Sequence, residues 1–147
     1  ELPGSSLYFP LSMKENPDSE PIVRTILSID EEKKSMTFAG NIPIGSTVRF
    51  MKGNTDKLIN ASYNAAEEIY KKQVHQPELA FLVSCVGRRI VLGNRIEEEL
   101  EVVKEVFGDN TLVCGFYSYG EISPTLKKVA CELHNQTMTI TTIYEQL

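Results

Sequence analysis

The stretch Val113 to Pro124 reads VCGFYSYGEISP and continues as TLKKVACELHNQT to Thr137. It begins like a strand and then enters a turn that is rich in polar residues. One Gly or Pro is usually enough to reverse a chain, yet this turn combines two glycines, two tyrosine hydroxyls, a carboxylate and a proline. Such density predicts a strand end at which a group is bound or held in position. The residues concerned are Gly115, Tyr117, Ser118, Tyr119, Gly120 and Glu121.

Upstream lies a continuous apolar run of strand length, Leu79 to Val86. Its uniform character predicts a central strand that is covered on both faces. Ile90 to Leu92 resume the apolar pattern, so we expect either a partner strand or a hairpin with Leu79 to Cys85 that has Gly87 and Arg88 in its turn. The other predicted strands alternate in hydrophobicity or are rich in β-branched residues. They are Leu7–Met13, Ile22–Ile29, Met36–Phe38, Thr47–Met51, Thr111–Tyr119, Lys128–Leu133 and Thr137–Tyr144.

Two segments have helical periodicity. Thr55 to Gln73 follows the N-cap candidate Asn54 and carries apolar residues along one face. Asn94 to Phe107 places Leu100 on its apolar stripe, which predicts that Leu100 lies in the core. Strands in runs with short connections predict an α+β fold, a mostly antiparallel sheet with two main helices packed on it. The sensory sheets of PAS-like and profilin-like domains offer an analogy.

Length and composition describe one ordinary folded domain. The chain has 147 residues, 41% hydrophobic and 24% charged, close to the averages of globular proteins. A net charge of −5 without an extended basic run argues against a nucleic-acid partner. No apolar run approaches the ~20 residues of a membrane span. Residues 1–21 hold four of the seven prolines and are predicted as an extended lead-in, with residues 22–147 as the domain.

Three sequence blocks together resemble the C-terminal domain of the FIST family. They are VSCVGRRIVLG at Val83–Gly93, GFYSYGEISP at Gly115–Pro124 and LHNQT at Leu133–Thr137. The resemblance implies an intracellular sensory domain without known catalysis, so we expect a cytoplasmic protein that is not an enzyme. It also implies an N-terminal FIST domain and a signalling module as partners. The chain begins at Glu1 without a methionine, as an excised piece would.

FIST domains are thought to recognise small ligands, amino acids among them, and a zwitterion would fit one guanidinium and one carboxylate. We therefore predict that Arg88, Glu121 and the loop from Tyr117 to Glu121 bind a small polar ligand, because arginine can clamp a carboxylate with two parallel hydrogen bonds. His134 and Asn135 complete the predicted site. The structural alternatives are an ion pair between Arg88 and Glu121, tyrosines that serve in packing, and an Asn135 that satisfies its own turn.

Two rival functions remain open from the sequence. Some FIST proteins are described as heme-based gas sensors, which would require an axial His or Cys. His75 and His134 are the only histidines and their spacing does not mark a heme site, so no cofactor is expected. A cysteine-dependent enzyme would use Cys85 as nucleophile, His134 as base, and Glu121 or Asn135 to orient the base.

The three cysteines are an odd number at wide spacing, unlike a disulfide framework or a metal site. Each lies in an apolar, strand-like run, which predicts buried free thiols in a reducing compartment. Burial would raise the pKa of Cys85 and shield it from substrate, so the binding function is preferred over the enzyme. The cysteines are Cys85, Cys114 and Cys131.

Overall fold

The computed structural model describes residues 4–124 and 131–145. Its helices are η1 (Gly4–Tyr8), α1 (Thr55–Lys72), α2 (Val86–Leu92), η2 (Gly93–Arg95) and α3 (Glu98–Phe107), where η marks a 3-10 helix. Its strands are β1 (Leu11–Lys14), β2 (Ile22–Arg24), β3 (Ile26–Asp30), β4 (Ser35–Phe38), β5 (Thr47–Phe50), β6 (Leu79–Cys85), β7 (Leu112–Ser118), β8 (Glu121–Pro124), β9 (Cys131–His134) and β10 (Met138–Ile143).

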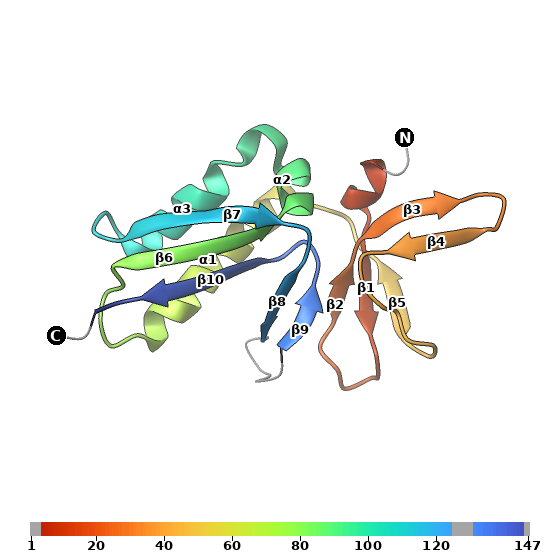
Figure 1. Cartoon of the computed structure of the whole chain (residues 1–147), viewed down its shortest axis with the longest axis horizontal. Coiled ribbons are helices and arrows are strands. Elements are labelled where there is room, and N and C mark those ends of the chain that lie inside the picture. The colour runs from red at the N-terminus through yellow and green to blue at the C-terminus, as the bar shows by residue number, and fades with distance from the viewer. Residues whose placement is uncertain (1–3, 125–130, 146–147) are drawn as a thin grey trace.

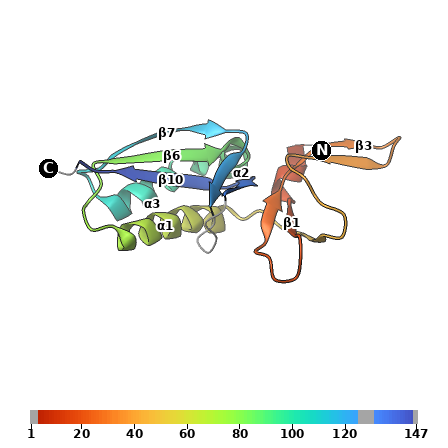
Figure 2. The same cartoon turned by 60° about the horizontal axis from the view of Figure 1, so that its bottom comes forward.

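The main layer of the fold is a three-stranded sheet in the order β10-β6-β7. Helices α1 and α3 lie together against one of its faces (Figures 1 and 2). β6 pairs antiparallel with β10 and parallel with β7. Apolar side chains from the sheet and both helices meet between the layers and form the core. Its buried members are Ala66, Ala80, Leu82, Val103 and Phe107.

The α+β prediction is confirmed. Two main helices lie on a sheet, and five of the six described strand pairs are antiparallel. α1 begins where its N-cap predicted, because the Asn54 side chain accepts a hydrogen bond from the Lys57 backbone N–H at 2.9 Å. The central position predicted for Leu79–Val86 is correct, since β6 lies between β10 and β7. The prediction that this strand is covered on both faces is wrong, because the described helices lie on one side of the sheet only (Figure 2).

The first five strands form two smaller sheets. β1 lies between β2 and β5, while β3 and β4 pair as a separate hairpin. The hairpin predicted between Ile22–Ile29 and Met36–Phe38 is therefore correct for β3 and β4, but β2 leaves it to pair with β1. As a result, β1 and β2, which lie before and after Pro21 in the sequence, share one sheet.

The β8–β9 hairpin lies between the two groups of strands (Figure 1). Arg24, itself buried, donates from Nη1 to the Leu133 carbonyl at 2.9 Å. Gln136 donates from Nε2 to the Leu7 carbonyl at 3.0 Å and to Thr25 Oγ1 at 3.3 Å. These bonds connect residues more than 100 positions apart. They join β9 and the residues that follow it to η1 and to the β2–β3 segment.

The hairpin predicted after Leu79–Val86 is wrong. Residues Val86–Leu92 form helix α2, which follows β6 without a turn. Gly87, Arg88, Val91 and Leu92 are buried, a spacing of one helical face. A short apolar run does not distinguish strand from helix by periodicity, and here the helical solution buries Arg88.

The core position predicted for Leu100 is also wrong, because its side chain is 42% exposed. The inward stripe of α3 is Glu99, Val103 and Phe107, so Glu99 occupies the core position that was expected of Leu100. A carboxylate can occupy a core position when a positive partner and hydrogen bonds compensate its lost hydration. Asn94 does not cap α3, since it lies in η2 and the helix begins at Glu98.

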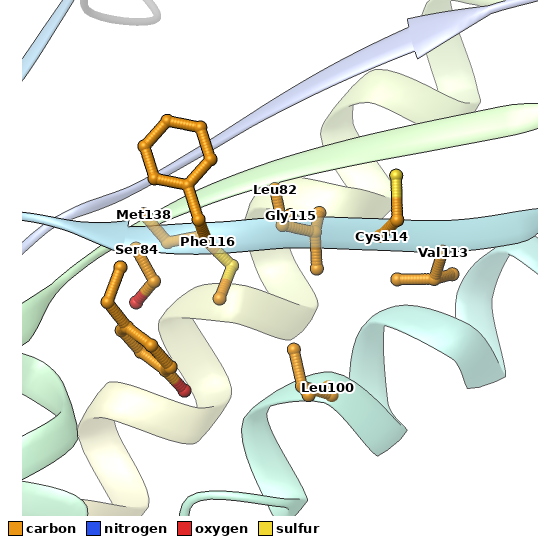
Figure 3. Close-up of a pocket in the computed structure, with 9 residues that line it drawn as sticks. Leu82, Ser84, Leu100, Val113, Cys114, Gly115, Phe116 and Met138 are labelled. Atoms are coloured by element: carbon orange, nitrogen blue, oxygen red, sulfur yellow. The ribbon is translucent and has the colours of Figure 1, made fainter.

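All three cysteines are free, as predicted. Cys85 is buried at the end of β6, but Cys114 and Cys131 are exposed, so the predicted burial is wrong for two of the three. The apolar neighbours of Cys114 suggested burial, yet its side chain points away from Leu100 of α3, to the side of the sheet opposite that helix (Figure 3). The strand pattern predicted for Lys128–Leu133 lies partly outside the described residues, and its described end belongs to β9.

Candidate functional site

A buried ion pair joins α2 to α3. The Arg88 and Glu99 side chains are 3% and 0% exposed, and Arg88 Nη2 lies 2.7 Å from Glu99 Oε2. Arg88 Nη2 also donates to the Leu58 carbonyl at 2.9 Å and Ser62 Oγ at 2.7 Å. Ser84 Oγ donates to the other carboxylate oxygen, Glu99 Oε1, at 3.0 Å. Both carboxylate oxygens therefore have hydrogen-bond partners, which compensate the hydration that the buried pair has lost.

A pocket of about 150 Å³ lies beside this pair, between α3 and the β10-β6-β7 sheet (Figure 3). Leu100 of α3 faces the underside of the sheet there, so the exposed position of Leu100 is explained by the hollow beside it. A cavity of this volume can hold a molecule the size of one benzene ring. Its lining includes Leu82, Ser84, Leu100, Gly115, Tyr117 and Met138.

Gly115 and Tyr117, two residues of the predicted site, line this pocket. Gly115 allows β7 to approach β6 closely, because a Cβ atom there would clash with the Leu82 carbonyl oxygen. Burial, followed by the negative charge of Glu99, raises the pKa of the Tyr117 hydroxyl. The hydroxyl therefore stays protonated near neutral pH and can donate a hydrogen bond. Arg89 stacks its guanidinium 5.3 Å from the centre of the Tyr117 ring.

Glu121 belongs to a different cluster. Its carboxylate is buried at the start of β8 and accepts hydrogen bonds from Ser118 Oγ and, at 2.8 Å, from Thr137 Oγ1. Arg88 pairs with Glu99 and not with Glu121, so the alternative of an Arg88–Glu121 ion pair is wrong. A ligand-binding function for Arg88 and Glu121 stays a prediction, and both side chains are already engaged within the protein.

His134 and Asn135 lie in the same hairpin as Glu121. His134 is the register partner of Glu121, and its Nε2 lies 3.1 Å from the Ser123 carbonyl. Asn135 is buried and accepts from the Thr25 backbone N–H at 3.3 Å. The predicted site therefore divides into a pocket group and a hairpin group. The pocket group is Gly115 and Tyr117, with Arg88 connected to the pocket residue Ser84 only through Glu99. The hairpin group is Ser118, Tyr119, Gly120, Glu121, His134 and Asn135.

The residues present do not fit a heme. His75 is exposed with its ring 5.3 Å from that of Tyr144, and the imidazole of the buried His134 contacts the Ser123 carbonyl. Neither histidine lines the pocket, which is far smaller than a porphyrin. Within residues 4–124 and 131–145, no group of three or more His, Cys, Asp or Glu side chains is placed to hold a metal ion.

The geometry gives little support to a cysteine nucleophile. Burial raises the pKa of the Cys85 thiol, and the Gly87 and Gln136 backbone N–H groups offset part of this shift. The thiol is therefore protonated at neutral pH, whereas the thiolate is the reactive form. Among the hydrogen bonds of the described residues, none joins Cys85 to His134. The expectation that the protein is not an enzyme stays a prediction.

Sequence reasoning missed Glu99, Ser84 and Ser62. The signal for Glu99 was present, because Glu99, Val103 and Phe107 are spaced by four and four and so share a helical face. The apolar Leu100 suggested the neighbouring stripe instead. The two serines carry no comparable signal, since small residues occur throughout helix and sheet interfaces.

Comparison with known proteins identifies the family. Residues 1–124 match the FIST C domain family, which covers more than half of the chain. No curated protein and no solved structure matches the chain. In the part of the chain that the structure describes, no helix has the length and apolar character to cross a membrane. The chain therefore belongs to the FIST C domain family, a family of sensory and signal-transduction domains, as the resemblance of its three sequence blocks predicted.

Proposed function

We propose that this domain senses a small ligand that binds in the pocket between α3 and the β10-β6-β7 sheet. The proposal is based on Ser84, which contacts both the pocket and the buried ion pair. It lines the pocket and also donates its hydroxyl hydrogen bond to Glu99 of the buried ion pair. A ligand in the pocket can therefore act directly on a bond that restrains the helices.

The pocket favours a small and mostly apolar ligand with one hydrogen-bonding end. Leu82, Leu100 and Met138 supply apolar walls, while Ser84 and Tyr117 supply hydroxyl groups. Ligand sites of this kind fix orientation with a few polar groups and gain affinity from apolar contact. The side chain of an apolar amino acid matches the walls, so amino acids, as the family resemblance implies, remain within the proposal.

The ion pair supplies a route from the pocket to the helices. Glu99 lies on α3, Arg88 on α2, and the two groups that accept from Arg88, Leu58 O and Ser62 Oγ, lie on α1. A ligand that accepts the Ser84 hydroxyl hydrogen bond in place of Glu99 would weaken the restraint on the three helices. A ligand that favours the Ser84–Glu99 bond would strengthen this restraint. A ligand changes a conformational equilibrium only if it binds the two states with different affinity, and this bond provides such a difference.

The proposed partners follow from the family. We place the domain in the cytoplasm, beside an N-terminal FIST domain and a linked or associated signalling module that receives the change in helix restraint. The acidic net charge of −5 fits a protein or small-molecule partner better than nucleic acid.

A thermal-shift screen tests the proposal, with the twenty amino acids, phenol, benzyl alcohol and isobutanol as probes. A ligand at 100 times its Kd stabilises the fold by about 2.7 kcal/mol, which a melting curve resolves. Calorimetric titration of the best probe then follows with Leu100→Phe, which should fill the pocket and abolish binding. Ile90→Phe is the matched control, because Ile90 is half exposed on α2 and does not line the pocket.

The outcomes separate clearly. Binding to the wild type and to Ile90→Phe, but not to Leu100→Phe, supports the pocket as the sensing site. A probe that binds all three proteins equally must bind elsewhere, and would direct attention to the hairpin group around Glu121. No stabilisation by any probe contradicts the proposed ligand class.

A further inference from the structure

Arg88 and Arg89 are neighbours on α2, but only Arg89 is available to a ligand. Arg88 is 3% exposed and uses its Nε and Nη2 atoms for hydrogen bonds inside the protein. Successive residues of a helix point ~100° apart, so Arg89 leaves α2 on another side, where it is exposed. Within residues 4–124 and 131–145, the Arg89 guanidinium makes no hydrogen bond or ion pair. Its donors are therefore free to bind an anion.

The Arg89 guanidinium lies beside one wall of the pocket. Its Cζ atom is 5.3 Å from the centre of the Tyr117 ring, and Tyr117 lines the pocket. Burial and then the charge of Glu99 raise the pKa of Tyr117, whereas the positive charge of Arg89 acts to lower it. The guanidinium is thus close enough to act on the hydroxyl at the tip of the ring. Arg89 and Tyr117 together supply hydrogen-bond donors on one side of the pocket.

The pocket itself is uncharged. None of the described residues that line it carries a formal charge, and most of them are apolar. A charged group inside such a cavity would lose its hydration without gaining a counter-charge. The interior therefore suits the uncharged part of a ligand, and a negative group of the same ligand is best placed beside Arg89.

The charge that Arg89 can balance is a single one. The chain as a whole has a net charge of −5, so it offers no general attraction to anions. A phosphate ester carries a charge of about −1.5 to −2 near neutral pH, whereas a carboxylate carries one negative charge. A carboxylate therefore matches one free guanidinium better than a phosphate ester does.

We propose that the ligand of the pocket is a small apolar carboxylate, with its tail in the pocket and its carboxylate bound by Arg89. This inference rests on the function proposed above and specifies the chemical class of the ligand. A guanidinium presents parallel N–H donors that match the two oxygens of a carboxylate. The Tyr117 hydroxyl can donate a further hydrogen bond to the same group. Arg89 then has the function that the sequence predicted for Arg88.

The two arginines would connect this ligand to the buried ion pair through one short helix. Arg88 binds Glu99 of α3 and the Leu58 carbonyl of α1, and Arg89 of the same helical turn binds the ligand. A ligand on Arg89 therefore acts on α2 directly, in addition to its contact with Ser84 in the pocket.

Calorimetric titration with two matched pairs of probes tests the proposal. Phenylacetate is compared with phenylacetamide, and isovalerate with isovaleramide. The members of a pair have the same tail and nearly the same shape, so the ratio of their affinities isolates the negative charge. The wild type should bind each acid roughly 10-fold or more tighter than its amide, as expected of a charge-assisted hydrogen bond.

Arg89→Gln removes the charge that the proposal requires. It should bring the affinity for each acid to within about 3-fold of that for its amide, while the affinity for the amides stays unchanged. A purely structural effect on the Tyr117 ring would instead weaken both members of a pair. Arg49→Gln is the matched control and should keep the wild-type ratio, because Arg49 is an exposed arginine of β5 that does not line the pocket.

The outcomes distinguish this inference from the proposed function. If the amides bind and the acids bind no more tightly, the pocket remains a ligand site but the carboxylate class is wrong. An acid preference that persists in Arg89→Gln also overturns the inference, as does acid binding that survives Leu100→Phe, which fills the pocket. If no probe of either pair binds, the inference fails together with the ligand class of the proposed function.

Discussion

Arg88 donates hydrogen bonds from both Nε and Nη2 to one oxygen of Glu99, Oε2, and the two side chains are buried together. The second carboxylate oxygen is left for Ser84 of the central strand, and Arg88 Nη2 also reaches α1. One ion pair thus connects the sheet to all three α-helices. A buried pair is weak evidence for net stability, but its geometry makes it a strong positional restraint.

Removal of either member of this pair should be severely destabilising. Glu99→Leu leaves a guanidinium buried without its partner, and the expected loss in the free energy of unfolding is about 3–5 kcal/mol. The double variant Arg88→Met/Glu99→Leu removes both charges and should be more stable than either single variant. Urea unfolding of the three proteins measures these differences. If the two single losses simply add in the double variant, the charges do not interact as the structure shows.

The two helical faces of α3 should respond differently to truncation. Phe107 is 1% exposed in the core, so Phe107→Ala should cost about 3–5 kcal/mol. Leu100→Ala should cost less than ~1 kcal/mol, because Leu100 is largely exposed beside a hollow. Thermal or urea unfolding measures both values. A loss above ~2 kcal/mol in Leu100→Ala would restore the core position that its sequence spacing predicted.

The elements that the sequence predicted well are those whose environment is uniform along their length. Leu79–Val86 is apolar at every position except Ser84, because β6 is the middle strand and the helices pack on one side of it. α1 is long enough for its periodicity to be plain, and its cap is a local contact between Asn54 and Lys57. Such signals depend on neighbours in the sequence, so no tertiary information was needed.

The errors at Arg88 and at Leu100 share one physical cause. Helix α2 has only seven residues, too few for an apolar run to show a helical period. In a hairpin turn Arg88 would be exposed to solvent, so a buried Glu99 would have no predicted positive partner. The apolar Leu100 was then the natural choice for the core. The position of Glu99 depends on a contact with another helix, and that contact is invisible until α2 is recognised.

The candidate site was predicted in part for the same reason. Gly115 and Tyr117 were found because glycine and tyrosine in alternation indicate close approach beside a hydrogen-bonding wall, and both line the pocket. Arg88 and Glu121 were expected in one site, but the structure places them apart. Arg88 pairs with Glu99, and Glu121 accepts hydrogen bonds from Ser118 and Thr137. Ser118, three residues before Glu121, could have been predicted as a local partner, but Thr137 could not.

Gly115 should tolerate no side chain. In Gly115→Ala, the new Cβ would clash with the backbone oxygen of Leu82, so the paired strands β6 and β7 would have to separate. We expect a loss at or above the ~1–3 kcal/mol typical of overpacked sites. Gly4→Ala is the control, because nothing lies within 4 Å of its added Cβ. Equal melting temperatures for Gly115→Ala and the wild type would contradict the close approach of these strands.

The buried thiol of Cys85 should make the free energy of unfolding depend on pH in the alkaline range. Burial raises the pKa of its thiol above the ordinary value of 9.0, so the folded protein keeps the proton after the unfolded chain has released it. The unfolded state then binds fewer protons, and the free energy of unfolding falls as pH rises from 9 towards the folded-state pKa. Cys85→Ala lacks this group, so its stability should fall less steeply between pH 8 and 10, even though its stability at pH 7 is lower. Urea unfolding at several pH values measures both slopes, and subtraction removes the contributions of tyrosines and lysines that the two proteins share. Parallel curves would show that the thiol ionises equally easily in the folded and unfolded states.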